Sequence, residues 1–268
     1  MAEQKLHLFI RTSLVAPLIG KSQYNKDYEA FIKLLNMNKY FIYNDNNEFD
    51  NILSLVSDYE NEIIKKKYTN INDLQKSLIE IQNFIYPDSI LEKYKKYMIC
   101  SFGKLNELLV LDKYLKINNI NKYEQDNNFK SIVIFDSDYF DITLTGKPDY
   151  IENNKTIIEI KNRIHTFSKN IKECDLIQLQ LYLNMYDIQM GKLVEGMIYS
   201  DNKIEINEFN IIKDENMFNN IKECIIRVCI LLFFLLKDED LYNNFNNKNN
   251  VDKSLFILNN IKKINEMF

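Results

Sequence analysis

Residues 146–161 read GKPDYIENNKTIIEIK, and most of the structure and chemistry that we expect of the chain follows from them. The run Thr156–Ile160 is rich in β-branched residues, which favour a buried strand. Alternate side chains of a strand lie on the same face. Glu159 and Lys161 are therefore expected to share one face, while Ile160 points into the core.

The same stretch contains a turn that brings a second carboxylate close to the strand. Asn153 and Asn154 separate two extended segments, as in the two-residue turn of a β-hairpin. This hairpin would place Asp149 beside Glu159. Two carboxylates and an ammonium group on one patch suit Mg²⁺, which prefers oxygen ligands and activates water beside a phosphate. The backbone carbonyl of Ile160 is a further candidate ligand.

Composition predicts a folded protein with a substantial core, because 46% of its 268 residues are hydrophobic and 27% are charged. The net charge of −4 counts mildly against tight nonspecific binding of nucleic acid, although a local basic groove is compatible with it. The four cysteines include no Cys-x-x-Cys pair, so we expect reduced thiols rather than a zinc or iron–sulfur site.

No signal for secretion or membrane insertion is recognisable in the sequence. The N-terminus lacks the basic-then-apolar pattern of a secretion signal. The longest apolar run, Val228–Leu236, is too short to span a bilayer. We therefore expect a cytoplasmic protein without a membrane partner, located in the host-cell cytoplasm if the protein is viral.

Helical patterns dominate the first part of the chain. Residues 8–24 are expected to form a short helix closed by Gly20, followed by a second helix that reaches about Leu35. Charged helical periodicity covers 47–86. A long helix is then predicted from about Ile90 to Leu115.

The period changes to alternation after this long helix. Strands are predicted at 131–135, 140–145, 156–161, 194–199 and 204–209. A helix is expected at 175–186, before the fourth of these strands. Further helices are expected at 221–236 and 254–267, separated by an Asn-rich loop at 243–250.

This order of elements predicts an α/β (α+β) fold with a central mixed sheet, in which the first three strands are antiparallel, flanked by helices. We expect a single domain over 1–268. It would comprise a helical elaboration at about 38–95, a catalytic core at about 96–212 and C-terminal helices at about 217–268.

Glu107 is a candidate for the metal patch because it lies on the predicted long helix before the sheet. A glycine within a helix costs about 1 kcal/mol relative to alanine. Gly103 therefore hints at close approach by another element. In isolation, an exposed helical glutamate remains the more ordinary interpretation of Glu107.

Polar residues on the helix predicted at 175–186 are further candidates. Gln178 and Tyr182 are four residues apart and so share one helical face, and Gln180 lies between them. An amide there could orient Lys161, a metal-bound water or a phosphate. Lys161 itself could hold the attacking water or offset charge, whereas acting as a general base would require a depressed pKa.

The N-terminal segment contains hydroxyl groups and cations that suit phosphate contact near a helix terminus. These residues are Arg11, Thr12, Ser13, Lys21, Ser22 and Tyr24. A solvated N-terminal turn would be an equally good explanation of them.

Taken together, these motifs resemble the PD-(D/E)xK nuclease superfamily, and within it the phage lambda exonuclease family of YqaJ-type viral recombinases. Four blocks match in order: the segment 13–24, Gly103-x-x-x-Glu107, Pro148-Asp149 to Glu159-Ile-Lys161, and Gln178-x-Gln180. Two positions depart from the family. Arg11 stands only two residues before Ser13, and Lys147 replaces a small residue before Pro148.

The resemblance implies a restriction-endonuclease-like core and metal-dependent digestion of linear double-stranded DNA, commonly 5′ to 3′, for recombination or repair. Glu107, Asp149 and Glu159 would hold one or two Mg²⁺ or Mn²⁺ ions. Lys161 would assist the nucleophile. Support for the site would come from Gln178 or Gln180. Duplex DNA ends are the implied substrate, with a homo-oligomer, a trimer by family analogy, and a single-strand annealing protein as further partners.

The sequence is also compatible with other functions. The chain could be a RecB-like, junction-resolving or endonucleolytic member of the same superfamily. It could also be a catalytically weak protein that only binds nucleic acid. The intact Asp149, Glu159 and Lys161 argue against the latter.

Overall fold

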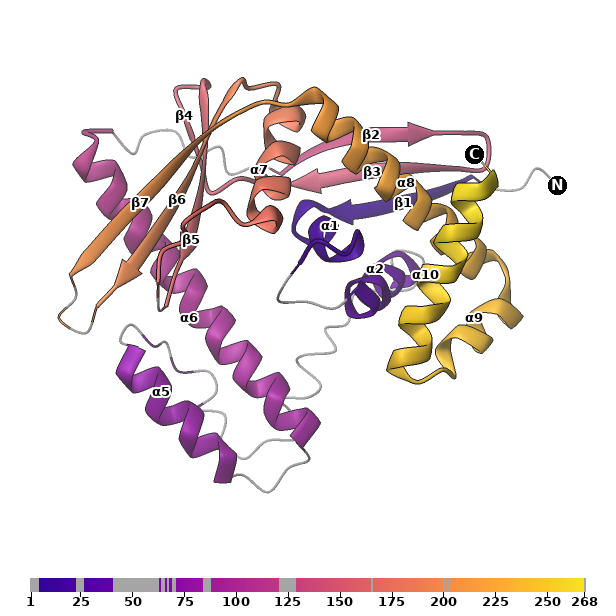
Figure 1. Cartoon of the computed structure of the whole chain (residues 1–268), viewed down its shortest axis with the longest axis horizontal. Helices are drawn as coiled ribbons and strands as arrows, with labels where there is room; N and C mark the ends of the chain where they lie inside the picture. Colours follow the sequence, from indigo (N-terminus) through magenta and orange to yellow (C-terminus); the bar gives the residue numbers. More distant parts are fainter. Residues whose placement is uncertain are drawn as a thin grey trace.

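A computed structural model gives the fold of the chain, which is mixed α/β as predicted (Figure 1). The residues that it describes are 5–22, 27–40, 63, 66, 68, 71–83, 88–120, 129–164, 166–199, 201 and 203–267. Tyr24 and most of the segment predicted as helical at 47–86 lie outside these residues.

The chain begins with a strand that the sequence does not reveal. Residues 8–11 were predicted to be helical, and this is wrong, because they belong to strand β1 (Leu6–Arg11). Leu8 and Ile10 are fully buried and alternate with less buried residues. This short pattern forms a strand rather than a helix because the segment pairs with β3. Helix α1 (Thr12–Leu18) follows directly, and Gly20 closes it in the left-handed region at φ 73°.

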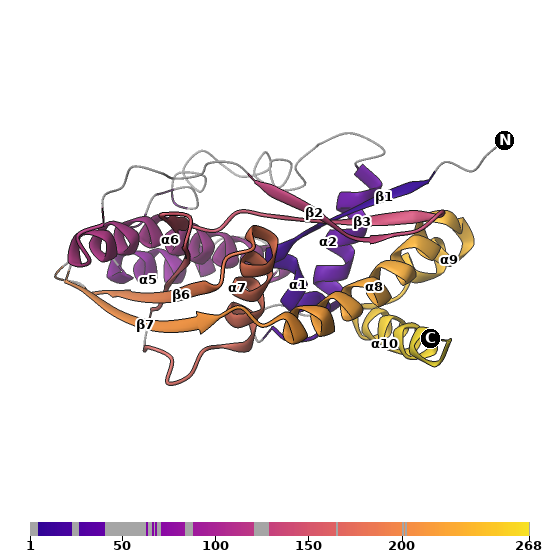
Figure 2. The ribbon, with the colours of Figure 1, turned by 90° about the horizontal axis from the view of Figure 1, so that it is seen from above.

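The described strands are divided between two mixed sheets (Figures 1 and 2). The first has the order β1-β3-β2, formed with β2 (Lys130–Asp136) and β3 (Phe140–Gly146). Strand β3 is parallel to β1 and antiparallel to β2.

The second sheet has the order β4-β5-β6-β7. Its strands are β4 (Tyr150–Glu152), β5 (Thr156–Asn162), β6 (Met190–Ile198) and β7 (Ile204–Ile212). Strands β5 and β6 are parallel, whereas the other two pairings are antiparallel.

The pairing of β5 corrects the prediction of three consecutive antiparallel strands in one central sheet. β5 pairs with the short strand β4 rather than with β3. Between β3 and β4 the residues Lys147, Pro148 and Asp149 are irregular. Because proline cannot donate a ladder hydrogen bond, the chain leaves the first sheet there and enters the second.

Helices cover both faces of the second sheet. Helix α6 (Asp88–Ile117) packs on one face of β5 and β6, and α7 (Glu173–Tyr186) packs on the other. The remaining described helices are α2 (Asp27–Tyr40), α5 (Ile71–Glu80) with a short 3-10 turn (Ile81–Asn83), α8 (Glu215–Lys237), α9 (Glu239–Asn246) and α10 (Asn250–Met267). Among the described residues, no helix is long and apolar enough to cross a membrane.

The Asn-rich loop predicted at 243–250 is partly wrong, because its first four residues lie in α9. Asp238 caps this helix by accepting a hydrogen bond from the backbone of Leu241. Phe245 is almost fully buried and packs against Phe31 and Phe256, which fixes the helix on the core.

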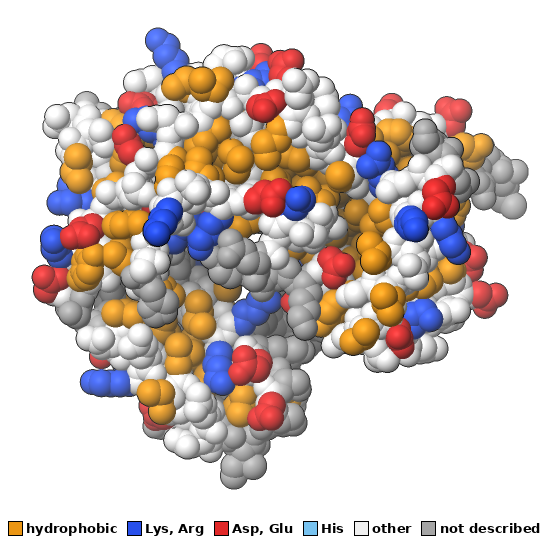
Figure 3. All heavy atoms as spheres, in the orientation of Figure 1, with side chains coloured by type: hydrophobic (Ala, Val, Ile, Leu, Met, Phe, Trp, Pro, Cys, Tyr) orange, Lys and Arg blue, Asp and Glu red, His pale blue; other side chains and the backbone are white. Residues whose placement is uncertain are grey.

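Apolar packing divides the molecule into a main core and two smaller clusters. The main core lies between the first sheet, α1, α7 and α8. A second cluster joins α5 to the first half of α6, and a third joins the second half of α6 to β5 and β6. Charged side chains of both signs are interspersed over the face in Figure 3 rather than gathered by sign.

Two glycines behave in opposite ways at the α6 layer. A Cβ at Gly103 would meet no heavy atom within 4 Å, so the predicted close approach at this glycine is wrong. Gly196 on β6, in contrast, faces Val110 so closely that an added Cβ would overlap the valine side chain. The second half of α6 therefore lies directly on the backbone of β6.

Candidate active site

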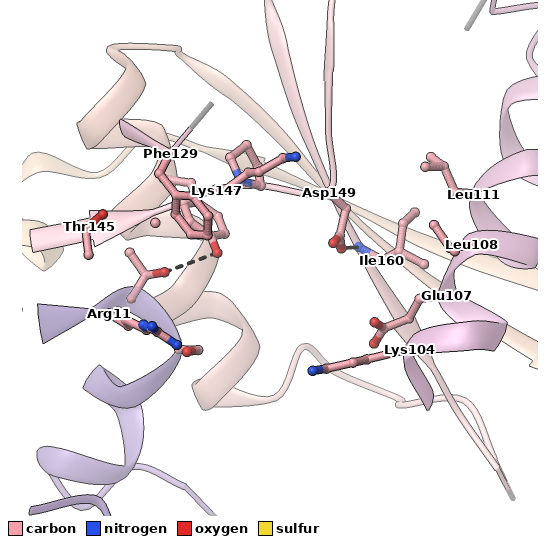
Figure 4. A pocket seen from close by; sticks show the side chains of 15 residues that line it. Arg11, Lys104, Glu107, Leu108, Leu111, Phe129, Thr145, Lys147, Asp149 and Ile160 are labelled. Atoms are coloured by element: carbon pink, nitrogen blue, oxygen red, sulfur yellow. Dashed lines mark hydrogen bonds between the residues drawn. The ribbon is translucent and has the colours of Figure 1, made fainter. Parts of the chain in front are cut away.

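A pocket of about 650 Å³ opens where α1, α6 and the link from β3 to β4 meet (Figure 4). Its lining residues are Arg11, Thr12, Ser13, Lys104, Glu107, Leu108, Leu111, Phe129, Thr145, Gly146, Lys147, Pro148, Asp149, Ile160 and Tyr182. Figure 4 shows Glu107 and Asp149 on one side of this pocket and Arg11 on the other. The pocket thus unites carboxylates and cations from distant parts of the chain.

The hairpin predicted within 146–161 places Asp149 as expected. Asn153 and Asn154 have φ values of 49° and 55°, as a two-residue hairpin turn requires. Asp149 then precedes the first paired residue of β4, and its Oδ2 accepts a hydrogen bond of 2.7 Å from the backbone N–H of Ile160. This bond fixes the carboxylate at the middle of β5.

Glu159 and Lys161 share one face of β5, as the strand pattern predicts, and Ile160 is fully buried on the other. The Nζ of Lys161 lies 2.7 Å from Oε1 of Glu159 and donates a longer bond of 3.3 Å to Oε1 of Gln178. Gln178 therefore orients the lysine, which is one of the roles considered for it.

This arrangement continues from Gln178 to α1. The Nε2 of Gln178 donates to the hydroxyl oxygen of Tyr182 at 3.1 Å, and Thr12 Oγ1 donates to the same oxygen at 3.1 Å. Thr12 and Tyr182 are both buried, and burial raises the pKa of Tyr182 to about 12. Elements far apart in sequence are thus tied to Lys161 by side-chain hydrogen bonds.

Burial works against the charged forms of all three carboxyl groups. It raises the pKa of Glu107 and of Asp149, and each of these shifts is opposed by the charge of Lys161. Burial, reinforced by the charge of Asp149, raises the pKa of Glu159 to about 8. The same carboxylates raise the pKa of Lys161 despite its own burial, so the lysine is held as an ammonium ion.

Glu159 has an unmet requirement in this cluster. Its Oε2 is buried and has no hydrogen-bond partner among the residues that the structure describes. A buried carboxylate oxygen without a partner is costly and calls for an explanation, such as an ion.

The donor set is the kind that Mg²⁺ and Mn²⁺ prefer, since it consists of carboxylates and a backbone carbonyl. Within the described part of the chain, however, no group of three or more His, Cys, Asp and Glu side chains is arranged to hold a metal ion. Lys161 instead supplies the positive charge next to Glu159. The residues fit a hard cation in chemistry, but their oxygens do not form a ready ligand set.

Some candidates from the sequence lie at the pocket and others do not. Arg11, Ser13 and Tyr182 line it. Lys21 does not, because its Nζ forms an ion pair of 2.9 Å with Glu173 at the start of α7. Lys21 therefore ties α1 to α7.

Gln180 also points elsewhere, although it was grouped with Gln178. Its Nε2 donates to the carbonyl of Ile212 at 2.7 Å, and its Oε1 accepts from the backbone of Asp214 at 2.9 Å. Two residues along a helix change the direction of a side chain by about half a turn, which explains the difference. Gln180 holds the connection between β7 and α8 and makes no contact with the carboxylates.

Several lining residues are not among the site residues that the sequence predicts. Lys104 lies three residues before Glu107 on α6 and so shares its face, which is a signal that the spacing contained. Lys147, within the stretch quoted first, also lines the pocket. Phe129 and Leu108 add exposed apolar surface, and nothing local in the sequence marks either of them.

Comparisons with known proteins give matches among solved structures alone, because no family model and no curated protein sequence matches the chain. An alkaline exonuclease from Laribacter hongkongensis is similar, with a TM-score of 0.45, 11% identity, and coverage of 87% of this chain and 93% of that chain. A phage related exonuclease from Haemophilus somnus has a TM-score of 0.45, 13% identity, and coverage of 86% and 96%, respectively.

Proposed function

We propose that the protein is a metal-dependent deoxyribonuclease, and more specifically an exonuclease that digests linear double-stranded DNA from 5′ to 3′ for recombination or repair. The observation that supports phosphodiester hydrolysis is the convergence of Glu107, Asp149, Glu159 and Lys161 beside one pocket. The finer assignment to DNA ends rests on the resemblance of the ordered motifs to the lambda exonuclease family.

The acidic residues would hold the metal, with Glu107, Asp149, Glu159 and the carbonyl of Ile160 as ligands. When bound, Mg²⁺ or Mn²⁺ would lower the pKa of a water molecule and stabilise charge on the phosphate. Lys161 contributes a fixed ammonium group that Gln178 orients. This group is suited to hold the attacking water and to offset negative charge as the bond breaks.

Other residues that line the pocket suit the rest of a nucleotide chain. Arg11, Lys104 and Lys147 offer cations to phosphates. Leu108 and Phe129 are 57% and 68% exposed, so they offer apolar surface to a sugar or base. A pocket lined by both cationic and exposed apolar side chains is compatible with binding of nucleic acid despite the acidic net charge of the chain.

The test compares three DNA substrates, each with Mg²⁺ or with EDTA. They are end-labelled linear duplex, covalently closed duplex and end-labelled single strand. We expect digestion of linear duplex in Mg²⁺ and none in EDTA. Label at either 5′ or 3′ end reports the polarity. Cutting of the closed duplex would instead favour an endonuclease, and binding without cleavage would rule out both enzymes.

Lys161→Ala tests the assigned chemistry, and we expect it to reduce the rate by about 1,000-fold or more, equivalent to about 4 kcal/mol. Lys213→Ala is the matched control. Lys213 is also largely buried and paired with a carboxylate, Asp187 at 2.7 Å, but its carboxylate partners are Asp187 and Glu215 rather than Glu107, Asp149 or Glu159. Equal losses in the two variants would show that the effect comes from folding rather than from chemistry.

The resemblance also leads us to propose a homo-oligomer, a trimer by family analogy, and a single-strand annealing protein as partner. Sedimentation of the purified protein tests the first. A single molecular mass equal to that of the monomer across the accessible concentration range would contradict it.

A further inference from the structure

A second buried ion cluster begins two residues beyond Lys161. The guanidinium of Arg163 lies between Asp175 on α7 and Glu195 on β6. Its Nη2 contacts Asp175 Oδ2 at 2.5 Å, and its Nε donates to Glu195 Oε1 at 2.7 Å. The three side chains are at most 10% exposed. We refer to Arg163, Asp175 and Glu195 as the arginine clamp.

The arginine clamp is well satisfied by its surroundings. The second oxygen of Glu195 accepts a hydrogen bond of 2.9 Å from the backbone of Ser168. The backbone N–H of Arg163 donates to the carbonyl of Gly196 at 2.8 Å. Although burial acts to raise the pKa of Glu195, these hydrogen bonds and Arg163 together hold it below its usual value. The clamp therefore joins β5, β6, α7 and the segment around Ser168 in one defined arrangement.

The choice of arginine at this position is informative. Arg11, Arg163 and Arg227 are the three arginines among 34 lysine and arginine residues. In a chain that uses lysine almost everywhere, an arginine marks a position where the planar fork of donors matters. Arg163 needs that fork because it bonds two carboxylates from different elements at once.

The arginine clamp is connected to Lys161 by two short paths. Along the chain, Arg163 follows Lys161 by two residues, and so continues the face of β5 that holds Glu159 and Lys161. Along α7, Asp175 precedes Gln178 by three residues and lies on a neighbouring part of the same helical surface. The clamp thus holds the two elements that supply the partners of the Lys161–Gln178 contact.

We propose that the arginine clamp is a positioning device that keeps β5 and α7 in the register at which Lys161 meets Gln178. The carboxylate partners of Arg163 are Asp175 and Glu195 rather than Glu107, Asp149 or Glu159, so it acts through Lys161 and is a positioning residue rather than a catalytic one. The consequence for the reaction rests on the proposed function, whereas the consequence for Lys161 does not.

Asp175→Ala is the most informative variant. Removing Arg163 would leave two buried carboxylates without their cation, and the protein could then fail to fold. Removing Asp175 leaves Arg163 and Glu195 as a neutral pair and cuts only the link to α7. We expect a folded protein in which kcat falls by about 10- to 100-fold while KM changes by less than about 2-fold.

The second measurement does not require activity. Lys161 is 19% exposed and held by Glu159, so amine-directed acylation should label it slowly. In Asp175→Ala, we expect mass spectrometry to show faster labelling of Lys161 by several-fold, with Lys237 as an internal reference. Asp175→Asn retains a hydrogen-bond acceptor and should recover part of both effects. Glu223→Ala is the matched control, because it removes the partner of Arg227 on the surface of α8.

The outcomes separate the two proposals. If wild-type protein hydrolyses no DNA, the proposed function fails, and the labelling still tests the clamp. A folded Asp175→Ala with wild-type kcat and unchanged Lys161 labelling would overturn the positioning role. Lower thermal stability with neither of these changes would show that the clamp is structural alone.

Discussion

Two buried ion clusters of similar composition lie side by side, one on strand β5 and one just beyond its end. They differ in how well their polar atoms are satisfied. The first pairs Lys161 with Glu159, and Asp149 lies close by. The second, the arginine clamp, pairs Arg163 with Asp175 and Glu195. Each has one cation and more carboxylates than that cation can neutralise.

The two clusters differ in how completely their polar atoms are satisfied. Both oxygens of Glu195 accept hydrogen bonds, and its pKa is lowered. Glu159 has a buried oxygen without a partner among the described residues, and its pKa is raised to about 8. A satisfied cluster stabilises a fold, whereas an unsatisfied one is maintained at a cost in stability. This difference is what we expect if the first cluster serves the proposed chemistry and the second stabilises the fold.

The largest expected effect is on stability and separates the two glutamates. Glu195→Gln should lower the free energy of unfolding by about 2–4 kcal/mol, because it breaks a buried and fully hydrogen-bonded ion pair. Glu159→Gln should cost less than about 1 kcal/mol at pH 8, because the neutral amide avoids burying a charge. Urea unfolding of both variants at pH 8 measures the difference. Equal losses would remove the distinction between the clusters.

A smaller effect is expected on the pH dependence of stability. The raised pKa of Glu159 means that the folded state binds more protons than the unfolded state between about pH 4.5 and pH 8. Stability from this group is therefore present at low pH and is lost as the pH rises through 8. We expect a decline on the order of 1 kcal/mol from pH 7 to pH 8.5 in EDTA.

Glu159→Gln should flatten this decline. Glu195 has the opposite sign, because its lowered pKa gives stability that is present above its unfolded value and is lost in acid. Urea unfolding across the pH series checks both signs. A decline that persists unchanged in Glu159→Gln would assign it to other groups.

The sequence predicts the first cluster far better than the second. The hairpin and the shared face of Glu159 and Lys161 follow from local turn and strand patterns within 146–161. The arginine clamp depends on long-range pairing, since 32 residues separate Arg163 from Glu195. A local sequence pattern cannot predict a pairing between residues so far apart in the chain.

The same limit applies to the fold. Helices α6 and α7 were predicted closely because their periodicity is local. The division of the strands into two sheets was not, because pairing partners are chosen by tertiary packing. Strand β1 was missed for the same reason, since a six-residue strand that leads directly into a helix resembles a helix start.

The smallest effects are expected from two glutamines of α7, one of which contacts Lys161 while the other supports the fold. Gln178→Ala should lower kcat by about 10-fold with little change in stability, because Gln178 orients Lys161. Gln180→Ala should leave kcat unchanged and lower the free energy of unfolding by about 1–2 kcal/mol, because Ile212 and Asp214 lose their partner. Steady-state kinetics and urea unfolding of both variants test this. A reversed assignment would contradict the geometry of α7.

The close packing of Gly196 against Val110 has a consequence for how this protein tolerates mutation. The bare backbone at this position sets the thickness of the layer between β6 and α6, and α6 also contains Glu107. Any larger residue would have to push the helix outward, and the carboxylate with it. A survey of inactivating substitutions would therefore rank a residue with no functional group beside the acidic ones. The position of Glu107 in the pocket therefore depends on the absence of a side chain at Gly196 on the strand beneath α6.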